Sequence, residues 1–245
     1  MDEQASTAED AALVATVRQE RSTWFIPGAI IAAGLILAVS VYVVRSSHVL
    51  GAPHGDITAL RAVSDADHII GNPSAPVMII EYADIDSSYG KAFQATMEQL
   101  MAEYAPAGQV AWVYRHFPLI DQYQNSELHA EAAECASSIG TPNTFWAFID
   151  TLQSRAPGSQ VFDPANYGSV AETLGLDTAR FDSCMTAHTY RTRVSQDISN
   201  AIEIGASGSP YVVVQVKGQK AVPISGSLPY DAMKKIIQQS IAKAQ

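Results

Sequence analysis

The stretch from Val77 to Met101 constrains the fold most strongly. It begins with an apolar run, Val77 to Ala83, that follows Pro76 and contains one charged residue, Glu81. Such a run is typical of a buried strand. Further on, apolar side chains recur at helical spacing, at Phe93, Met97, Leu100, Met101 and Tyr104. This spacing predicts a helix with one face against a sheet.

The short turn between this strand and this helix is polar. Ser87 or Ser88 is placed to cap the helix. A strand that enters a helix through such a turn leaves the first N–H groups of the helix directed at the turn. Asp84 and Asp86 lie at this positive end, a favourable placement that requires no function.

The same stretch resembles the active-site region of DsbA-like thiol–disulfide oxidoreductases, a branch of the thioredoxin fold. In that family the helix opens with Cys-x-x-Cys after a run such as Glu-Phe-x-Asp-Phe-x. Residues 81–86, Glu-Tyr-Ala-Asp-Ile-Asp, match the run, and Tyr89, Lys91 and Phe93 match what surrounds the motif. The two cysteine positions hold Ser87 and Gly90. The resemblance therefore implies a DsbA-like site without its sulfurs.

Three further segments carry the resemblance across about three-quarters of the chain. Residues 68–76 resemble the lead-in to the first core strand, and residues 110–119 resemble the second core strand. Residues 205–214 resemble the segment that carries the family's cis-proline, here Pro210 after Ser209. Because cis X-Pro bonds make up only ~5% of such bonds, the cis assignment depends on the resemblance.

The resemblance implies an α/β, thioredoxin-like (DsbA-like) fold over residues 65–245, with an inserted helical block at about 120–204. Periodicity within the block predicts helices over residues 126–138, 143–152 (with Asn143 as cap), 167–174, 178–186 and 190–204. Residues 210–216 and 221–224 predict an antiparallel pair around Gly218, and residues 230–242 predict a closing helix.

The segment from Trp24 to Val44 is free of charged residues. A helix of about 21 residues is ~31 Å long, enough for a hydrocarbon core of ~30 Å. Trp24 and Tyr42 lie near its ends, where amphipathic rings favour the membrane interface. We expect one uncleaved transmembrane helix before the fold. A cleaved signal peptide is the alternative, but its apolar region is usually only ~7–15 residues.

The expected anchor divides the N-terminal region into a tail before it and a linker after it. Residues 1–23 predict a cytoplasmic tail, and residues 45–64 a linker. Arg18 and Arg21 before the segment give a weak positive-inside bias. We expect a single-pass protein of the plasma (inner) membrane, with the N-terminus cytoplasmic and the large domain extracytoplasmic. The lipid bilayer is then one partner, through residues 24–44.

Charge argues against a nucleic-acid partner. The chain has 25 acidic and 15 basic residues, a net charge of −10. Phosphate binding needs clustered Lys and Arg, and the sequence contains no such cluster beyond Lys234-Lys235. We expect that pair to lie on a solvated helix face.

The two cysteines, Cys135 and Cys184, both fall in the predicted helical block. Some DsbA-like relatives carry a structural disulfide at similar places, and an even cysteine count in an exported domain favours a bridge. Two separate buried thiols are one alternative. A metal site with His188 and His129 is another, but without a paired Cys-x-x-Cys we expect no metal site and no cofactor.

The substituted motif limits the chemistry at Ser87. Dithiol exchange needs one thiolate to attack and a second thiol to resolve, and neither Ser87 nor Gly90 supplies one. A nucleophilic serine would need a base, for which His116 and Glu81 are the candidates, and helix capping is the simpler interpretation. Glu81 is costly to bury unpaired, so we expect it to face a polar pocket.

We therefore expect a DsbA-like protein that binds or escorts extracytoplasmic polypeptides. The resemblance implies a peptide-binding surface around the cis-proline, formed by Ser88, Tyr89, Ser209, Pro210 and Tyr211. Two enzymatic alternatives remain. One is a glutathione-dependent enzyme similar to kappa-class glutathione transferases, which use a serine at the position of Ser87; the other is an oxidoreductase that acts through Cys135 and Cys184.

Overall fold

The computed structural model describes residues 55–156 and 161–244, which belong to one unit, His54–Gln245. The expected tail, 1–23, and transmembrane segment, 24–44, lie outside the described residues. Within the described ranges no helix is both long and apolar enough to cross a bilayer.

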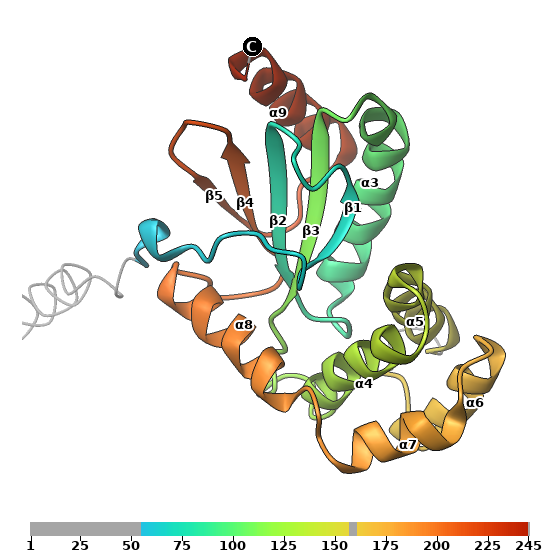
Figure 1. Ribbon diagram of the computed structural model, residues 1–245. Coiled ribbons are helices and arrows are strands. Elements are labelled where there is room, and N and C mark those ends of the chain that lie inside the picture. Colours follow the sequence, from blue (N-terminus) through green and yellow to red (C-terminus); the bar gives the residue numbers. More distant parts are fainter. Residues whose placement is uncertain (1–54, 157–160, 245) are drawn as a thin grey trace, which may run out of the picture. The chain divides into compact units, whose positions relative to one another are not determined.

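A five-stranded mixed sheet lies at the centre of the unit, in the order β1-β3-β2-β4-β5 (Figure 1). The strands are β1 (His68–Gly71), β2 (Val77–Ala83), β3 (Val110–His116), β4 (Tyr211–Val216) and β5 (Val222–Ser225). β2 and β3 are parallel, and the other neighbouring pairs are antiparallel. The predicted strand at 77–83 and the antiparallel pair at the C-terminus are confirmed.

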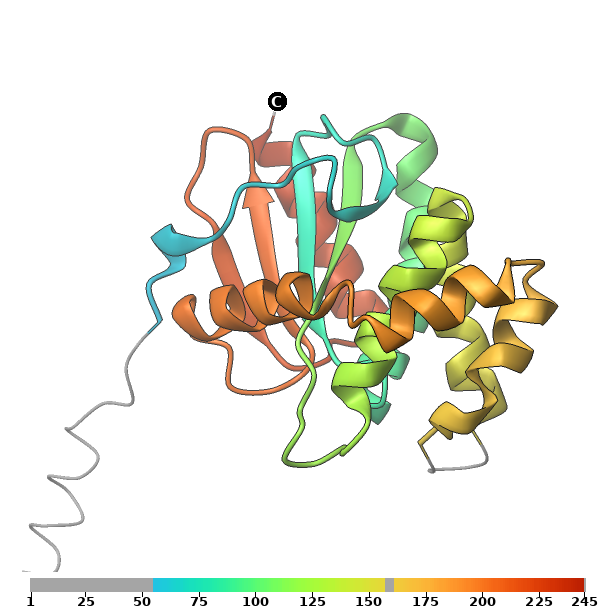
Figure 2. The ribbon, with the colours of Figure 1, turned by 60° about the horizontal axis from the view of Figure 1, so that its bottom comes forward.

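Two helices, α3 (Ser88–Tyr104) and α9 (Tyr230–Lys243), pack on one face of the sheet. The stripe foreseen for α3 is buried there, because Phe93, Met97 and Leu100 contact β-strand residues such as Val77 and Trp112. Helix α8 (Arg191–Glu203) covers the opposite face, and Figure 2 shows it crossing the strands with α9 behind them. The central strands are buried on both sides, which explains their nearly continuous apolar sequence.

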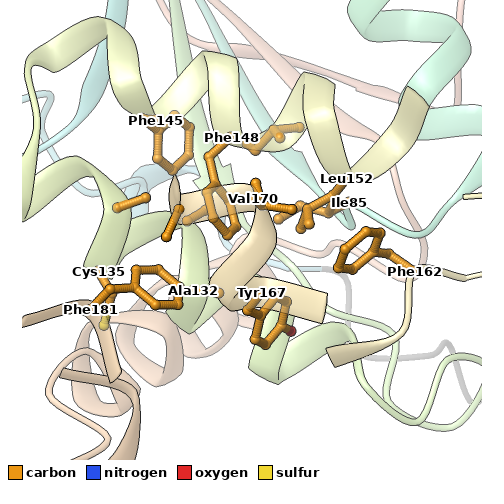
Figure 3. Close-up of a cluster of buried hydrophobic side chains, with 14 of the residues drawn as sticks. Ile85, Ala132, Cys135, Phe145, Phe148, Leu152, Phe162, Tyr167, Val170 and Phe181 are labelled. Atoms are coloured by element: carbon orange, nitrogen blue, oxygen red, sulfur yellow. The ribbon is translucent and has the colours of Figure 1, made fainter. Parts of the chain in front are cut away.

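The helical block has a hydrophobic core of its own. It consists of α4 (Ser126–Ile139), α5 (Pro142–Arg155), α6 (Tyr167–Thr173) and α7 (Thr178–Thr186), with α8 leading back to the sheet. Figure 3 shows the aromatic centre of this core, where Phe148 lies 5.7 Å from Phe181 and 6.2 Å from Tyr167 between ring centroids. The five predicted helices are present to within a few residues at their ends.

One helix start differs from the sequence prediction. Asn143 is not the cap of α5, because the helix begins at Pro142 with Thr141 as its N-cap. Thr141 N–H donates to Thr144 Oγ1 at 2.8 Å. Proline is favoured at the first helical position, where its missing N–H would have no partner within the helix.

The domain starts earlier than predicted, because residues 55–64 of the expected linker are part of the fold. Ile57, Leu60 and Val63 pack against the α8 face of the sheet. The fully buried Arg115 holds this segment: its guanidinium donates to the carbonyls of Arg61 and Ala62 at 3.0 and 3.1 Å. These contacts join residues more than 50 positions apart, so local composition could not reveal them.

Candidate functional site

The end of β2, the start of α3 and the start of β4 meet at one corner, at the foot of the sheet in Figure 1. We call it the Ser87 corner: the turn Asp84–Ser87, the first turn of α3, and Ser209-Pro210. The Ser209–Pro210 peptide bond is cis, as the resemblance implied. Pairing of Tyr82 with Tyr211 sets this bond beside the end of β2.

Ser87 is the N-cap of α3. Its Oγ accepts a hydrogen bond from Gly90 N–H at 3.3 Å, and its hydroxyl donates to the Ser209 carbonyl at 3.5 Å. The two bases considered from the sequence are used elsewhere: His116 pairs with Glu134, and Glu81 accepts from Trp112. Among the described residues, Ser87 therefore has no base to activate it, and its contacts are those of a cap.

Gly90 lies where main chain approaches main chain. A Cβ built on Gly90 would lie 2.8 Å from the Asp84 carbonyl oxygen and 3.6 Å from Ser209 Oγ. The φ of Gly90 is not positive, so the close approach alone disfavours a side chain here. The backbone at the corner therefore leaves little room for a side chain at position 90.

Asp84 joins the corner to the loop after β3. Its carboxylate accepts from Leu119 N–H at 2.6 Å and from Asp86 N–H at 2.8 Å. Its own N–H donates to Ser209 Oγ at 2.7 Å, which ties the turn to the cis-proline segment. Burial raises the pKa of Asp84 to about 6, although the two backbone donors favour the charged form.

A buried histidine contacts the turn from behind. His129 Nδ1 contacts Asp86 Oδ2 at 2.7 Å, and His129 Nε2 contacts the Phe162 carbonyl at 3.0 Å. The two contacts tie the turn to α4 and to the segment that holds Phe162. Sequence reasoning considered His129 only beside Cys135, because no local pattern links it to Asp86.

Glu81 does not face a polar pocket as expected. Its side chain is fully buried, and Trp112 Nε1–H donates to Oε2 at 2.8 Å. Oε1 has no hydrogen-bond partner among the described residues. Burial raises the pKa of Glu81 to about 8, against the smaller effect of the indole donor.

A groove of about 210 Å³ opens beside the corner, between α3 and the helical block. Its walls combine Ser87, Ser88 and Lys91 with apolar side chains that include Leu152 and Phe162. The Lys91 ammonium donates to the Gln153 carbonyl at 2.7 Å, so α3 and α5 are joined along the groove. A ligand here would meet both hydrogen-bonding groups and an apolar wall.

The expected peptide-binding residues differ in exposure. Ser88 is exposed, and Tyr89 is 69% exposed at the start of α3. Ser209 is half-buried, and Pro210 is buried. Tyr211 is buried: it packs in the core and its hydroxyl donates to the Ile204 carbonyl at 2.9 Å. A strand buried on both faces leaves its first side chain no route to the surface.

Cys135 and Cys184 form a disulfide that joins α4 to α7, with their Cα atoms 5.9 Å apart. The expected bridge is confirmed, and the alternative of two separate thiols is wrong. Thiolate ligation with His188 or His129 is excluded as well, because both sulfurs are in the bridge. The bridge belongs to the helical block, and neither cysteine lines the groove beside Ser87.

This arrangement defines a class: a DsbA-like thioredoxin fold. The chain belongs to the thioredoxin family, whose model matches residues 63–239. It is similar in structure to Wolbachia pipientis alpha-DsbA1, at 18% identity over 77% of this chain and 98% of that one, with a TM-score of 0.65. It is also similar to Pseudomonas aeruginosa DsbA2, at 23% identity over 73% and 96% of the two chains, with a TM-score of 0.60.

One relative in sequence is named as an antiporter, whereas the similar structures are named as DsbA proteins. The chain is 33% identical over 199 residues to the Na(+)/H(+) antiporter NhaA 3 of Salinispora tropica. The match covers 81% of this chain but only 28% of that protein. The shared part is therefore a minor portion of the antiporter's length.

Proposed function

We propose that this protein is a membrane-anchored, extracytoplasmic DsbA-like protein that binds polypeptides without exchanging disulfides. The observation that carries the proposal is the Ser87 corner, which keeps a cis-proline and an adjoining groove while Ser87 and Gly90 occupy the sulfur positions. In this proposal the fold keeps the groove and lacks the thiols that disulfide exchange requires.

The packing of the corner supports a non-catalytic role. Disulfide exchange needs an attacking thiolate and a resolving thiol, and the corner has neither. The hydroxyl of Ser87 is used for capping, and Gly90 packs against the Asp84 carbonyl. The Cys135–Cys184 bridge lies on other helices and has the properties of a structural link, with Cys135 1% exposed.

The groove supports a polypeptide as the ligand. Leu152 and Phe162 supply an apolar wall, and Tyr89 presents a large exposed ring on the first turn of α3, next in sequence to Ser88 of the lining. An extended polypeptide can pair its main chain with exposed main-chain groups of a binding protein, while apolar pockets receive its alternate side chains. A polypeptide therefore offers hydrogen-bonding groups and apolar side chains together.

Anchoring is supported by the uncharged segment Trp24–Val44. It agrees with the kind of relative found, since a protein named as an antiporter contains a region similar to this chain. We extend only the membrane association to this protein, and no transport activity.

Photo-crosslinking in intact cells tests the proposal. The full-length chain carries a photoreactive phenylalanine analogue in place of Tyr89, the exposed ring on the first turn of α3. The matched control carries it in place of Ile202, a similarly exposed apolar side chain on α8. Polypeptide adducts from position 89 and none from position 202 are expected. Equal labelling at both positions, or none at 89, would refute a polypeptide site at the corner.

A glutathione-dependent enzyme is the second candidate. The observation in its favour is that Ser87 caps α3 and lines the groove together with Lys91, where a thiolate and a carboxylate could both be accommodated. Calorimetric titration of the full-length chain with glutathione separates the two: saturable binding that Ser87→Ala abolishes would favour the enzyme over the polypeptide binder.

A further inference from the structure

Three polar side chains converge at a place that shares no lining residue with the groove beside Ser87. His68 comes from β1, His116 from the end of β3, and Glu134 from α4. His68 Nε2 lies 2.9 Å from Glu134 Oε1, and His116 Nε2 lies 3.1 Å from the same oxygen. One ligand atom from each residue lies within 4.8 Å of the others.

The cluster opens on a second groove, of about 440 Å³. His68 and Glu134 line it, and His116 lies behind them, 1% exposed. The lining also includes Asp65, which is exposed, and Asp67, whose buried carboxylate pairs with Arg61 and Arg115. A small cation can therefore reach His68 and Glu134 from solvent through this groove.

We propose that His68, His116 and Glu134 bind one divalent transition-metal ion of the zinc class, with its remaining coordination position open to this groove. Two imidazole nitrogens and one carboxylate oxygen are the donor set of three-ligand zinc sites, which keep one position for water. Magnesium and calcium prefer oxygen ligands and fit this set less well.

The spacing of the donor atoms fits such an ion. Ligands ~2.0–2.1 Å from a tetrahedral ion lie ~3.3 Å from each other. The observed 2.9 and 3.1 Å separations need only a small outward movement. His116 Nδ1 has no partner among the described residues, so it can take the ring proton when Nε2 binds the ion, at the loss of the Nε2 contact with Glu134.

The surroundings hold the ligands in place. The His68 ring stacks on Phe145, with centroids 3.4 Å apart and planes 6° apart, and the His116 ring meets Phe145 edge-on. Arg193 Nε donates at 2.6 Å to the same oxygen, Glu134 Oε1, and orients the carboxylate. Its positive charge opposes a cation, so the guanidinium must move away from Oε1 when the ion binds.

Sequence reasoning missed this cluster because its members are far apart. His68 and Glu134 are 66 positions apart, and no spaced motif connects them. The site is independent of the polypeptide groove, so its failure would leave the proposed function untouched.

Metal titration of the full-length chain tests the proposal. The protein is purified in mild detergent without reductant, so that the disulfide keeps both thiols out of reach, and is freed of metal with a chelator. Isothermal titration with Zn²⁺ should give one equivalent of saturable binding. Co²⁺ used in its place should give the visible absorption of a four-coordinate site.

Two ligand variants and one matched control sharpen the test. His68→Asn and Glu134→Gln should each weaken Zn²⁺ binding by at least ~10-fold, a loss that even second-shell changes cause. The control, His188→Asn, removes an imidazole that contacts Glu131 instead of Glu134 and should keep the wild-type affinity.

Any of three results would overturn the proposal: no saturable Zn²⁺ binding by the wild-type chain, unchanged affinity in folded His68→Asn, or loss of binding in His188→Asn. Far-UV circular dichroism checks the fold of each variant. If Glu134→Gln fails to fold, His68→Asn decides the question, because the His68 side chain is 11% exposed at the edge of the groove.

Discussion

Replacing Glu81 with glutamine should remove a pH dependence from the stability of this fold. The carboxyl is fully buried, and its pKa is raised to about 8 from an ordinary value of 4.5. Between these two pH values the folded chain keeps the proton while the unfolded chain releases it. Stability therefore falls as pH rises through this interval.

The magnitude follows from the same two values. The interval is about 3.5 pH units, and each unit corresponds to about 1.4 kcal/mol, so the wild type loses at most about 5 kcal/mol between pH 4.5 and pH 8 from this group. Glutamine has the shape of the protonated acid and does not ionise. Its unpaired N–H group costs about 1–3 kcal/mol at every pH, which shifts the curve without changing its slope.

Urea unfolding of the unit His54–Gln245, followed by tryptophan fluorescence from pH 5 to pH 8, measures the effect. The difference in unfolding free energy, Glu81→Gln minus wild type, should increase at each step upward in pH. Glu172→Gln, on an exposed position of α6, is the control and should follow the wild type. A constant difference between Glu81→Gln and wild type across this range would refute the reasoning.

The disulfide and the Ser87 corner allow further predictions. A Cys135→Ser/Cys184→Ser variant should lose about 4 kcal/mol of unfolding free energy, the chain-entropy value for a loop with a sequence separation of 49, and unchanged urea unfolding would contradict this. The unit should show no turnover in insulin reduction or in reoxidation of reduced ribonuclease; turnover that Cys135→Ser abolishes would place a redox centre at the bridge. Ser87→Cys should give a thiol with a pKa below ~8.5, read from thiolate absorbance against pH, because the α3 N-terminus stabilises the anion; ordinary titration would mean that position 87 is not the attacking position. Adding Gly90→Cys should cost about 1–3 kcal/mol from overpacking against the Asp84 carbonyl, and an unchanged unfolding midpoint would show that α3 yields freely.

Local patterns in the sequence were enough for most of the fold. The strand at 77–83 and the helix at 178–186 have the predicted bounds, because apolar periodicity and capping residues act over a few neighbouring positions. The order of the strands was not predicted, since periodicity alone does not say which strands pair.

What the sequence could not predict depends on residues brought together from afar. The His129–Asp86 pair and the Arg115 contacts to residues 61 and 62 each join positions more than 40 apart. The burial of Tyr211 depends on what covers β4 on both faces. The close approach at Gly90 is a property of the backbone path, and a glycine in the sequence does not say whether space or conformation requires it.

The approach of α3 to the Asp84 carbonyl makes positions 87 and 90 differ in what a cysteine there would cost. Serine and cysteine are close in size, so position 87 can accept a sulfur with little change in packing. A cysteine at position 90 carries in addition the cost of overpacking against the carbonyl. A form with one thiol is therefore easier to reach than a form with two. Such a single thiol can attack a disulfide but cannot release the mixed disulfide that forms. If polypeptides occupy the groove as proposed, a thiol at position 87 alone would hold them covalently.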